Sequence, residues 1–385
     1  MGKKRICVVV TARASYSRFK TALTAIREHE KLELILIAAA SALLDRYGSA
    51  IDVMEADGFT IAGKVYNVVE SGNLTGQAKT TGLGIIELAN VFENQKPDVV
   101  VTIADRYETM STAIAASYMN IPLVHIQGGE VTGNIDEKVR HAITKLSDLH
   151  LVATEKAKER VLKMGENVDK VFVTGCPSID LAKNVATNQQ LNFDPYLKYG
   201  GVGGQPDFTN GYIILLQHAV TSEFESARKH VEETLQAIIE IKLPAFVFWP
   251  NADAGSDGTS KGIRAFREQH EIQNIHFFKN MEPEDFLIFL RNSRCIIGNS
   301  SVGVRESSFL GVPAVNIGSR QNNRERGENV IDVAYDKVEI IEAINSQLKN
   351  GHYKPNDLYG SGNSGITIAN LIADTDLGFT KKITY

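Results

Sequence analysis

Cysteine is scarce in this sequence of 385 residues, which holds only Cys7, Cys176 and Cys295, far apart along the chain. An odd, scattered set does not form a disulfide framework and is typical of a reducing compartment. Long apolar runs are also missing, since none reaches the ~18 residues of a membrane-spanning helix. The stretch MGKKRICVVV lacks the longer apolar region of a secretory signal. We therefore expect a cytoplasmic protein with no membrane partner.

An excess of basic charge is missing as well. Lys and Arg number 41 against 46 Asp and Glu, which gives a net charge of −5. Because nucleic-acid-binding proteins usually carry a basic face, we expect no nucleic-acid partner. Apolar residues make up 43% and charged residues 23%, the balance of a globular protein long enough for two domains.

Signature motifs for cofactors and metals are absent too. The segment Gly82-Leu83-Gly84 lacks the third glycine of a dinucleotide-binding turn and follows no predicted strand. The chain has no G-x-x-x-x-G-K-[ST], no G-x-S-x-G, no H-E-x-x-H and no paired C-x-x-C. These absences indicate chemistry by side-chain acids and bases, with no cofactor and no metal.

What the sequence does have is a regular alternation of short β-branched runs with stretches of helical periodicity. Runs that are apolar on both faces and separated by helices predict βαβ units and parallel sheets. The predicted strands are Arg5–Val10, Leu34–Ala38, Asp98–Ile103, Leu123–Gln127, His150–Thr154, Val171–Thr174, Tyr212–Leu216, Ala245–Trp249, Ile275–Phe278, Cys295–Ile297 and Ala314–Ile317.

The glycine-rich stretch Tyr199–Gly204 interrupts this alternation and is predicted to be a linker or loop. We expect an α/β protein with two Rossmann-like domains around a central cleft, at residues 1–185 and 186–365, and a C-terminal tail at 366–385. Ligands of such sheets bind beyond the carboxyl ends of the strands.

The segment Gly298–Leu310 combines a predicted strand end with a predicted helix. A helix N-terminus offers free N–H groups and the positive end of a dipole, which suits a phosphate. Gly303 lets a ligand approach the backbone, and the carboxylate of Glu306 can accept hydrogen bonds from ribose hydroxyls. A plain capped helix is the alternative. The capping residue types here are Asn299, Ser300 and Ser301.

Acidic residues gather after two other predicted strands. Asp105 and Arg106 follow one of them, and a Gly-Gly turn after the next leads to Glu130, Asp136 and Glu137. Asp136 and Glu137 can also be ordinary charges at a helix N-terminus. Three acids within a stretch of eight residues after a strand nevertheless favour a proton-transfer site.

Basic and amide side chains follow further predicted strands. His218 comes directly after one strand, although a structural role is its alternative, and Asn251 follows the next. Arg13 and Arg320 also lie just beyond strands, where a guanidinium can bind phosphate bidentately. Polar clusters thus recur at carboxyl strand ends.

These motifs, taken in order, span almost the whole chain and resemble the hydrolysing UDP-N-acetylglucosamine 2-epimerases, some of which act on UDP-N,N'-diacetylbacillosamine. The stretches that carry the resemblance are Arg13–Ser17, Asp105-Arg106, His125–Glu130, Ile135–Lys145, Gly175–Ser178, Gln217-His218, Gly298–Glu306 and Asn316–Gln321.

The resemblance implies a glycosyltransferase-B-like fold, a homodimer or homotetramer and a UDP-sugar substrate. It also implies anti elimination of UDP to a 2-acetamidoglucal, followed by hydration to free N-acetylmannosamine, which feeds nonulosonic acid synthesis. The expected catalytic residues are Asp105, Glu130, Asp136, Glu137 and His218. The expected UDP-sugar-binding residues are Arg13, Ser17, Arg106, Gln127, Asn251, Asn299, Ser300, Ser301, Gly303, Glu306 and Arg320.

Two residues depart from the family pattern. Several relatives have a catalytic Glu where this chain has Gln127, and many have His at the position of Ala42. Glu130 or Glu137 can supply the missing carboxylate, and both departures are compatible with a different sugar. The alternatives are the diacetylbacillosamine substrate, a non-hydrolysing epimerase, a glycosyltransferase of the same fold and a nucleotide-sugar sensor.

Overall fold

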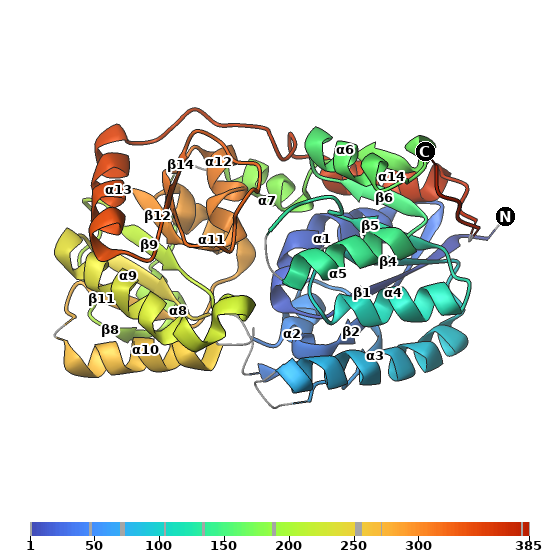
Figure 1. Cartoon of the computed structure of the whole chain (residues 1–385), viewed down its shortest axis with the longest axis horizontal. Helices are drawn as coiled ribbons and strands as arrows, with labels where there is room; N and C mark the ends of the chain where they lie inside the picture. Colours follow the sequence, from blue (N-terminus) through green and yellow to red (C-terminus); the bar gives the residue numbers. More distant parts are fainter. Residues whose placement is uncertain are drawn as a thin grey trace. The chain divides into compact units, whose positions relative to one another are not determined.

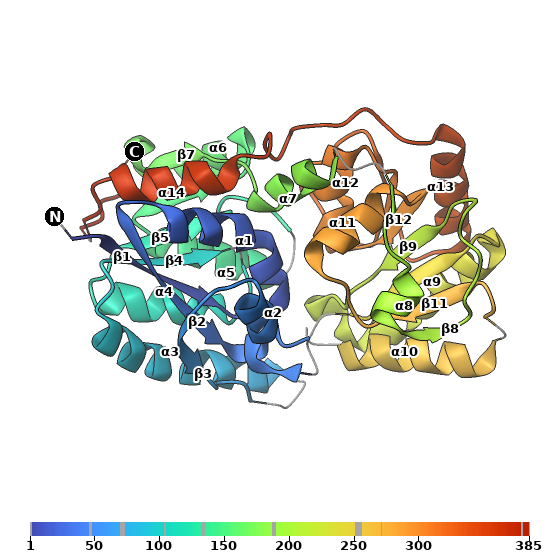
Figure 2. The ribbon, with the colours of Figure 1, turned by 180° about the vertical axis from the view of Figure 1, so that it is seen from behind.

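The computed structural model divides the chain into two compact units. Unit 1 consists of Met1–Glu130, Ile135–Asp180 and Tyr359–Tyr385, and unit 2 of Val131–Asn134 and Leu181–Leu358. In each unit helices cover a central sheet (Figures 1 and 2). The structure describes residues 2–45, 48–69, 74–103, 105–132, 135–186, 190–250, 256–270, 272–378 and 380–384.

The sheet of unit 1 has seven parallel strands in the order β3-β2-β1-β4-β5-β6-β7. The strand order reverses between β1 and β4, which pair with Val8 beside Val101. Ligands of such sheets bind outside the carboxyl ends of the strands at this reversal. The strands are β1 (Lys4–Val10), β2 (Leu32–Ala39), β3 (Ile61–Val65), β4 (Val99–Ile103), β5 (Leu123–Ile126), β6 (Leu149–Val152) and β7 (Val171–Val173).

Helices bury both faces of this sheet, as the apolar runs predict. Ile6 and Val8 of β1 point into a core shared with α1 and α14, whereas Cys7 and Val9 point into a second core shared with α3, α4 and α5. Burial on both faces explains why these strands are apolar throughout. The helices of this unit are α1 (Arg13–Glu28), α2 (Ala50–Ala56), α3 (Leu74–Gln95), α4 (Thr109–Tyr118), α5 (Ile135–Leu146), α6 (Glu155–Lys163) and α14 (Ser364–Asp374), with the short turns η1 (Ala40–Leu43) and η3 (Val168–Lys170).

Unit 2 repeats this plan with the strand order β14-β13-β12-β9-β10-β11-β8. Its reversal lies between β9 and β12, which pair in parallel with Leu216 beside Gly298. The strands are β8 (Val202–Gly203), β9 (Ile213–Leu216), β10 (Ala245–Phe248), β11 (Ile275–Phe278), β12 (Cys295–Gly298), β13 (Ala314–Ile317) and β14 (Val330–Val333). The helices are α8 (Pro195–Tyr199), α9 (Ala227–Ile241), α10 (Ser256–Gln269), α11 (Pro283–Arg291), α12 (Glu306–Leu310) and α13 (Lys337–Asn350), with η4 (Thr221–Ser226) and η5 (Ser301–Gly303), and α7 (Pro177–Ala186) contains the boundary between the units.

The C-terminal segment is part of unit 1, which differs from the separate tail expected at 366–385. Asp180 accepts hydrogen bonds from the N–H groups of Ser364 (2.8 Å) and Gly365 (2.7 Å) at the start of α14. At the other end of this helix, the Lys4 ammonium donates to the carbonyl of Ile372 at 2.9 Å. Both helix ends are thereby satisfied by unit 1, and α14 lies along α1 (Figure 2).

The linker predicted at Tyr199–Gly204 is instead built into unit 2. Tyr199 ends α8, and Val202 in β8 pairs antiparallel with Phe277 of β11. The glycines are needed because the chain passes close to a neighbouring strand: a Cβ on Gly204 would lie 1.9 Å from the carbonyl oxygen of Gln273. None of the described helices combines the length and apolar character needed to cross a bilayer.

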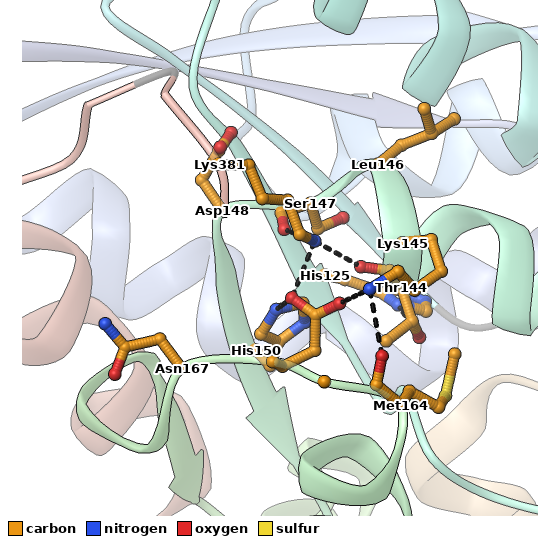
Figure 3. A network of polar contacts seen from close by, with 12 residues as sticks. His125, Thr144, Lys145, Leu146, Ser147, Asp148, His150, Met164, Asn167 and Lys381 are labelled. Atoms are coloured by element: carbon orange, nitrogen blue, oxygen red, sulfur yellow. Dashed lines mark hydrogen bonds and ion pairs between the residues drawn. The ribbon is translucent and has the colours of Figure 1, made fainter. Parts of the chain in front are cut away.

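A buried polar network lies beside β6 in unit 1 (Figure 3). The Glu166 carboxylate accepts hydrogen bonds from Lys145 Nζ (2.7 Å) and His150 Nε2 (2.9 Å), and pairs with Lys381 Nζ (2.6 Å). Burial raises the pKa of Glu166, but these hydrogen bonds outweigh it and lower the pKa to about 2. The network therefore depends on an ionised Glu166.

Replacing Glu166 with Gln is expected to lower the free energy of unfolding by about 3 kcal/mol at pH 7, because the pKa is depressed from its ordinary value. Since the folded-state pKa lies below the unfolded value of 4.5, this stabilisation is complete above that value and is lost as pH falls toward 2. Urea unfolding over a pH series measures it. The exposed Glu159→Gln is the control, and an equal loss in both variants would contradict the prediction.

Candidate active site

Arg13 and Asp105 lie just beyond the two strands that flank the reversal in unit 1. Arg13 is the first residue of α1, directly after the loop that follows β1, and its Nη1 donates to the carbonyl of Gly48 at 2.7 Å. Asp105 comes two residues after β4. Ser17 is half-buried one turn further along α1. The sequence thus correctly locates polar side chains at this edge of the sheet.

Arg140 joins three of the polar segments of unit 1. Its guanidinium forms an ion pair with the Asp105 carboxylate, and its Nη1 donates to the backbone carbonyl of Glu130 at 2.8 Å. The Arg140 side chain is only 1% exposed, whereas that of Asp105 retains 16%. An ion pair of this kind positions a carboxylate that remains accessible from solvent.

The first turn of α5 carries Asp136 and Glu137, one turn before Arg140. Because residues four apart share a helix face, Asp136 lies on the same side of α5 as Arg140. Both acidic side chains are half-buried, and Glu137 Oε1 lies 3.4 Å from Nε2 of His141. The Glu130 side chain is buried at the end of the loop after β5. Unit 1 therefore carries four carboxylates on the loops after β4 and β5 and on the first turn of α5: Asp105, Glu130, Asp136 and Glu137.

Arg106 and Gln127 make internal contacts beside this group. Arg106 binds Glu108 through two hydrogen bonds of 3.0 and 3.2 Å, the bidentate geometry of an ion pair. Gln127 has a φ of +64°, and its buried amide donates to Cys176 Sγ at 2.8 Å while its oxygen lies 3.4 Å from Arg18 Nη1. An amide cannot take up a proton as a carboxylate does, so Gln127 cannot serve as a general base.

In unit 2, Asn299 ties together the strand ends at the reversal. Its Oδ1 accepts the N–H of His218 at 2.7 Å, and its Nδ2 donates to the His218 carbonyl at 2.8 Å. The backbone carbonyl of Asn299 accepts hydrogen bonds from Arg320 (3.2 Å) and Gln321 (2.9 Å). The side chain of Asn299 thus serves the fold, while His218 and Arg320 are held at the carboxyl edge of the sheet.

The segment after β12 is not the continuous helix that the capping residues predict. Ser300 accepts the N–H of Val302 at 3.4 Å, and this starts only the short turn η5, with α12 beginning at Glu306. Val302 and Val304 are β-branched and Gly303 is flexible, so helix propensity here is low. Ser300, Ser301 and Gly303 therefore surround a turn rather than the start of a long helix.

Glu306 has an unpaired buried carboxylate oxygen, and Gly303 lies where a side chain would fit. Glu306 is 7% exposed, and its Oε2 has no hydrogen-bond partner among the described residues. Added at Gly303, a Cβ would make only ordinary contacts of 3.9 Å. A buried unpaired carboxylate oxygen is costly, which is a reason to expect a donor from a ligand. Asn251, also expected here, lies outside the described residues.

Four members of these two groups were not among the expected site residues: Arg140, Arg18, Gln321 and Tyr335. Arg140 carries a usable signal, because it lies three residues before the apolar Ile143, which is buried, and residues three apart share a helix face. Tyr335 hydrogen-bonds Asn299, and burial raises its pKa to about 12. It comes from the loop after β14, a strand that the sequence pattern did not predict, so its proximity to Asn299 could not be inferred.

Comparison with known proteins agrees with this arrangement. A family model described as UDP-N-acetylglucosamine 2-epimerase matches residues 24–373. The hydrolysing UDP-N,N'-diacetylbacillosamine 2-epimerase of Legionella pneumophila is 33% identical over 365 residues, covering 93% of each chain. Polysialic acid biosynthesis protein P7 of Escherichia coli is 35% identical over 347 residues, covering 89% of this chain and 85% of the relative.

The fold has close counterparts among solved structures. A Neisseria meningitidis UDP-GlcNAc 2-epimerase bound to UDP-GlcNAc superposes with a TM-score of 0.80, covering 96% of this chain and 100% of that chain at 19% identity. Two α/β units with polar strand ends at each reversal define a glycosyltransferase-B-like protein. Within that class, the chain belongs to the UDP-N-acetylglucosamine 2-epimerase family, as the motifs predict.

Replacing Arg140 with Met is expected to lower the free energy of unfolding by about 3 kcal/mol, because it leaves Asp105 without this partner and removes a donor to Glu130. Lys138→Met, at an exposed position on the same helix, should change it by less than about 0.5 kcal/mol. Urea unfolding of both variants measures the difference. Equal stability of the two would contradict the assigned ion pair.

Proposed function

We propose that this chain is a hydrolysing 2-epimerase that converts a UDP-2-acetamido sugar, with UDP-N-acetylglucosamine as its main substrate, into UDP and a free sugar of the N-acetylmannosamine type. The observation that carries the proposal is the ion pair between Asp105, after β4, and Arg140 of α5, the helix whose first turn bears Asp136 and Glu137. Two relatives support hydrolysis and a role in supplying nonulosonic acid synthesis: the hydrolysing epimerase of Legionella pneumophila and the polysialic acid biosynthesis protein of Escherichia coli.

The reaction needs leaving-group departure and proton transfer rather than an enolate, because the C2 hydrogen is not adjacent to a carbonyl. Breaking the anomeric C–O bond sends its electron pair to the departing UDP. A carboxylate takes the C2 proton, and a C1–C2 double bond forms, which gives a 2-acetamidoglucal. Water then supplies a hydroxyl to C1 and a proton is returned to C2 on the opposite face, which completes epimerisation with release of the free sugar.

Unit 1 supplies the proton-transfer groups in this proposal. Asp105 and Asp136 act as the acid/base residues, and the ion pair with Arg140 positions the Asp105 carboxylate. Because Gln127 cannot exchange a proton, Glu130 or Glu137 serves in the step for which relatives use a Glu at that position. Glu137 is half-buried and lies beside His141, and Glu130 is buried after β5. Either carboxylate can fill this role.

Unit 2 binds UDP in this proposal. Arg320 and His218 lie at the strand ends where negative charge on a departing diphosphate needs stabilisation. The unpaired Oε2 of Glu306 suits ribose hydroxyl donors. Ser300 and Ser301 provide hydroxyls at the same edge of the unit 2 sheet.

A second substrate has support of its own. The Legionella pneumophila relative is named for UDP-N,N'-diacetylbacillosamine. That sugar differs from N-acetylglucosamine on the sugar ring and not in the nucleotide, so it leaves the UDP-binding proposal unchanged.

Incubating the protein with each UDP-sugar and identifying products by chromatography tests the proposal. We expect UDP and free sugar in equal amounts, with UDP-N-acetylglucosamine turned over faster. Asp105→Asn and Asp136→Asn should each lower kcat by about 10²- to 10⁴-fold, because each removes a proton-transfer group. Calorimetry should show unchanged UDP binding by both variants.

The exposed Asp169→Asn is the matched control and should keep full activity. An epimerised UDP-sugar without free sugar would identify a non-hydrolysing epimerase. Sugar transfer only in the presence of an acceptor would identify a glycosyltransferase, and UDP binding without any turnover would identify a sensor.

A further inference from the structure

The C-terminal segment around Lys381 is attached to the end of α5 (Figure 3). The Lys381 ammonium donates to the backbone carbonyls of Thr144 (3.1 Å) and Ser147 (2.6 Å). Thr144 is in the last turn of α5, and Ser147 is the first residue after it. Thr384 adds a backbone hydrogen bond to Gly165 at 3.0 Å. A cation placed on unsatisfied carbonyls at a helix C-terminus satisfies them and complements the helix dipole.

Glu166 connects Lys381, which caps the end of α5, to Lys145 on that helix. Its carboxylate pairs with Lys381 at 2.6 Å and with Lys145 at 2.7 Å, and Lys145 also donates to the Met164 carbonyl at 3.0 Å. The Glu166 side chain is 2% exposed, so water screens these charges little. The end of α5 is therefore held by two ammonium groups on one buried carboxylate.

The same end of α5 is tied to the sheet. Thr144 Oγ1 lies 3.1 Å from Nδ1 of the buried His125 on β5, and Glu166 binds His150 on β6 at 2.9 Å. Figure 3 shows His125, Thr144, Lys145, His150 and Lys381 gathered around this point. The C-terminal end of α5 is thus anchored to two strands and to the tail at once.

We propose that Lys381 is a positioning residue for the proton-transfer groups, because it fixes the helix that carries Asp136, Glu137 and Arg140. This inference rests on the proposed function. A 12-residue helix is about 18 Å long and stiff, so holding one end sets the position and rotation of the other. An error of about 1 Å in a reacting group can cost about 10²-fold in rate.

The experiment compares Lys381→Met, Lys381→Gln and Lys381→Arg with the control Lys382→Met, a neighbouring exposed lysine. Lys381→Gln keeps donors without charge and serves if Lys381→Met does not fold. We measure kcat and KM well below the unfolding temperature, UDP affinity by calorimetry, and amide hydrogen exchange of peptides covering 135–140 and 141–146.

We expect Lys381→Met to lower kcat about tenfold or more while UDP affinity stays within about twofold, because the displaced groups act on the sugar. Exchange should accelerate in both peptides, the first turn of α5 included. Lys381→Arg should restore most of kcat, and Lys382→Met should behave as the wild type.

The inference would be overturned if Lys381→Met lowered the unfolding temperature but left kcat unchanged, with faster exchange confined to 141–146. Lys381 would then be a stabilising residue only. If the wild-type protein turns over no UDP-sugar, the proposed function fails. The exchange of the 135–140 peptide then decides separately whether Lys381 controls the first turn of α5.

Discussion

The arrangement of the polar residues in unit 1 depends on the ion pair and the hydrogen bond that the buried Arg140 guanidinium makes. This guanidinium cannot lose its charge, and burying it requires partners. Those partners are Asp105 after β4 and the Glu130 carbonyl after β5. One side chain therefore brings two strand ends to a helix whose first turn holds Asp136 and Glu137. In unit 2 the uncharged side-chain amide of Asn299 has the corresponding role, because it joins the backbone of His218 to the end of β12.

Much of this could be predicted because parallel strands buried on both faces must be apolar along their whole length. The end of each apolar run therefore marked the carboxyl edge of a sheet, and the polar residues just beyond it, such as Asp105 and His218, were correctly placed there. The family motifs supplied the order of these residues along the chain. The roles assigned to individual residues, by contrast, remain predictions.

Contacts between segments distant in sequence could not be predicted. Lys381 looks like an ordinary charged position in the sequence. For both Arg140 and Lys381, only the folded chain shows which carboxylate or carbonyl the side chain contacts. The prediction of a continuous helix after β12 was wrong, because it rested on the N-cap residues alone. The low helix propensity of Val302, Gly303 and Val304 permits only a short turn there. The return of α14 to unit 1 depends on Asp180, which nothing in the local pattern distinguishes.

The measurement that tests the account most directly is proton NMR of the products formed from UDP-N-acetylglucosamine in heavy water. If a carboxylate of unit 1 removes the C2 proton and a solvent-exchanged proton returns to the opposite face, the free N-acetylmannosamine must carry deuterium at C2, with one UDP released per sugar. Free sugar that retains hydrogen at C2, or whose configuration at C2 is unchanged, would contradict proton transfer at C2 and the role proposed for these carboxylates.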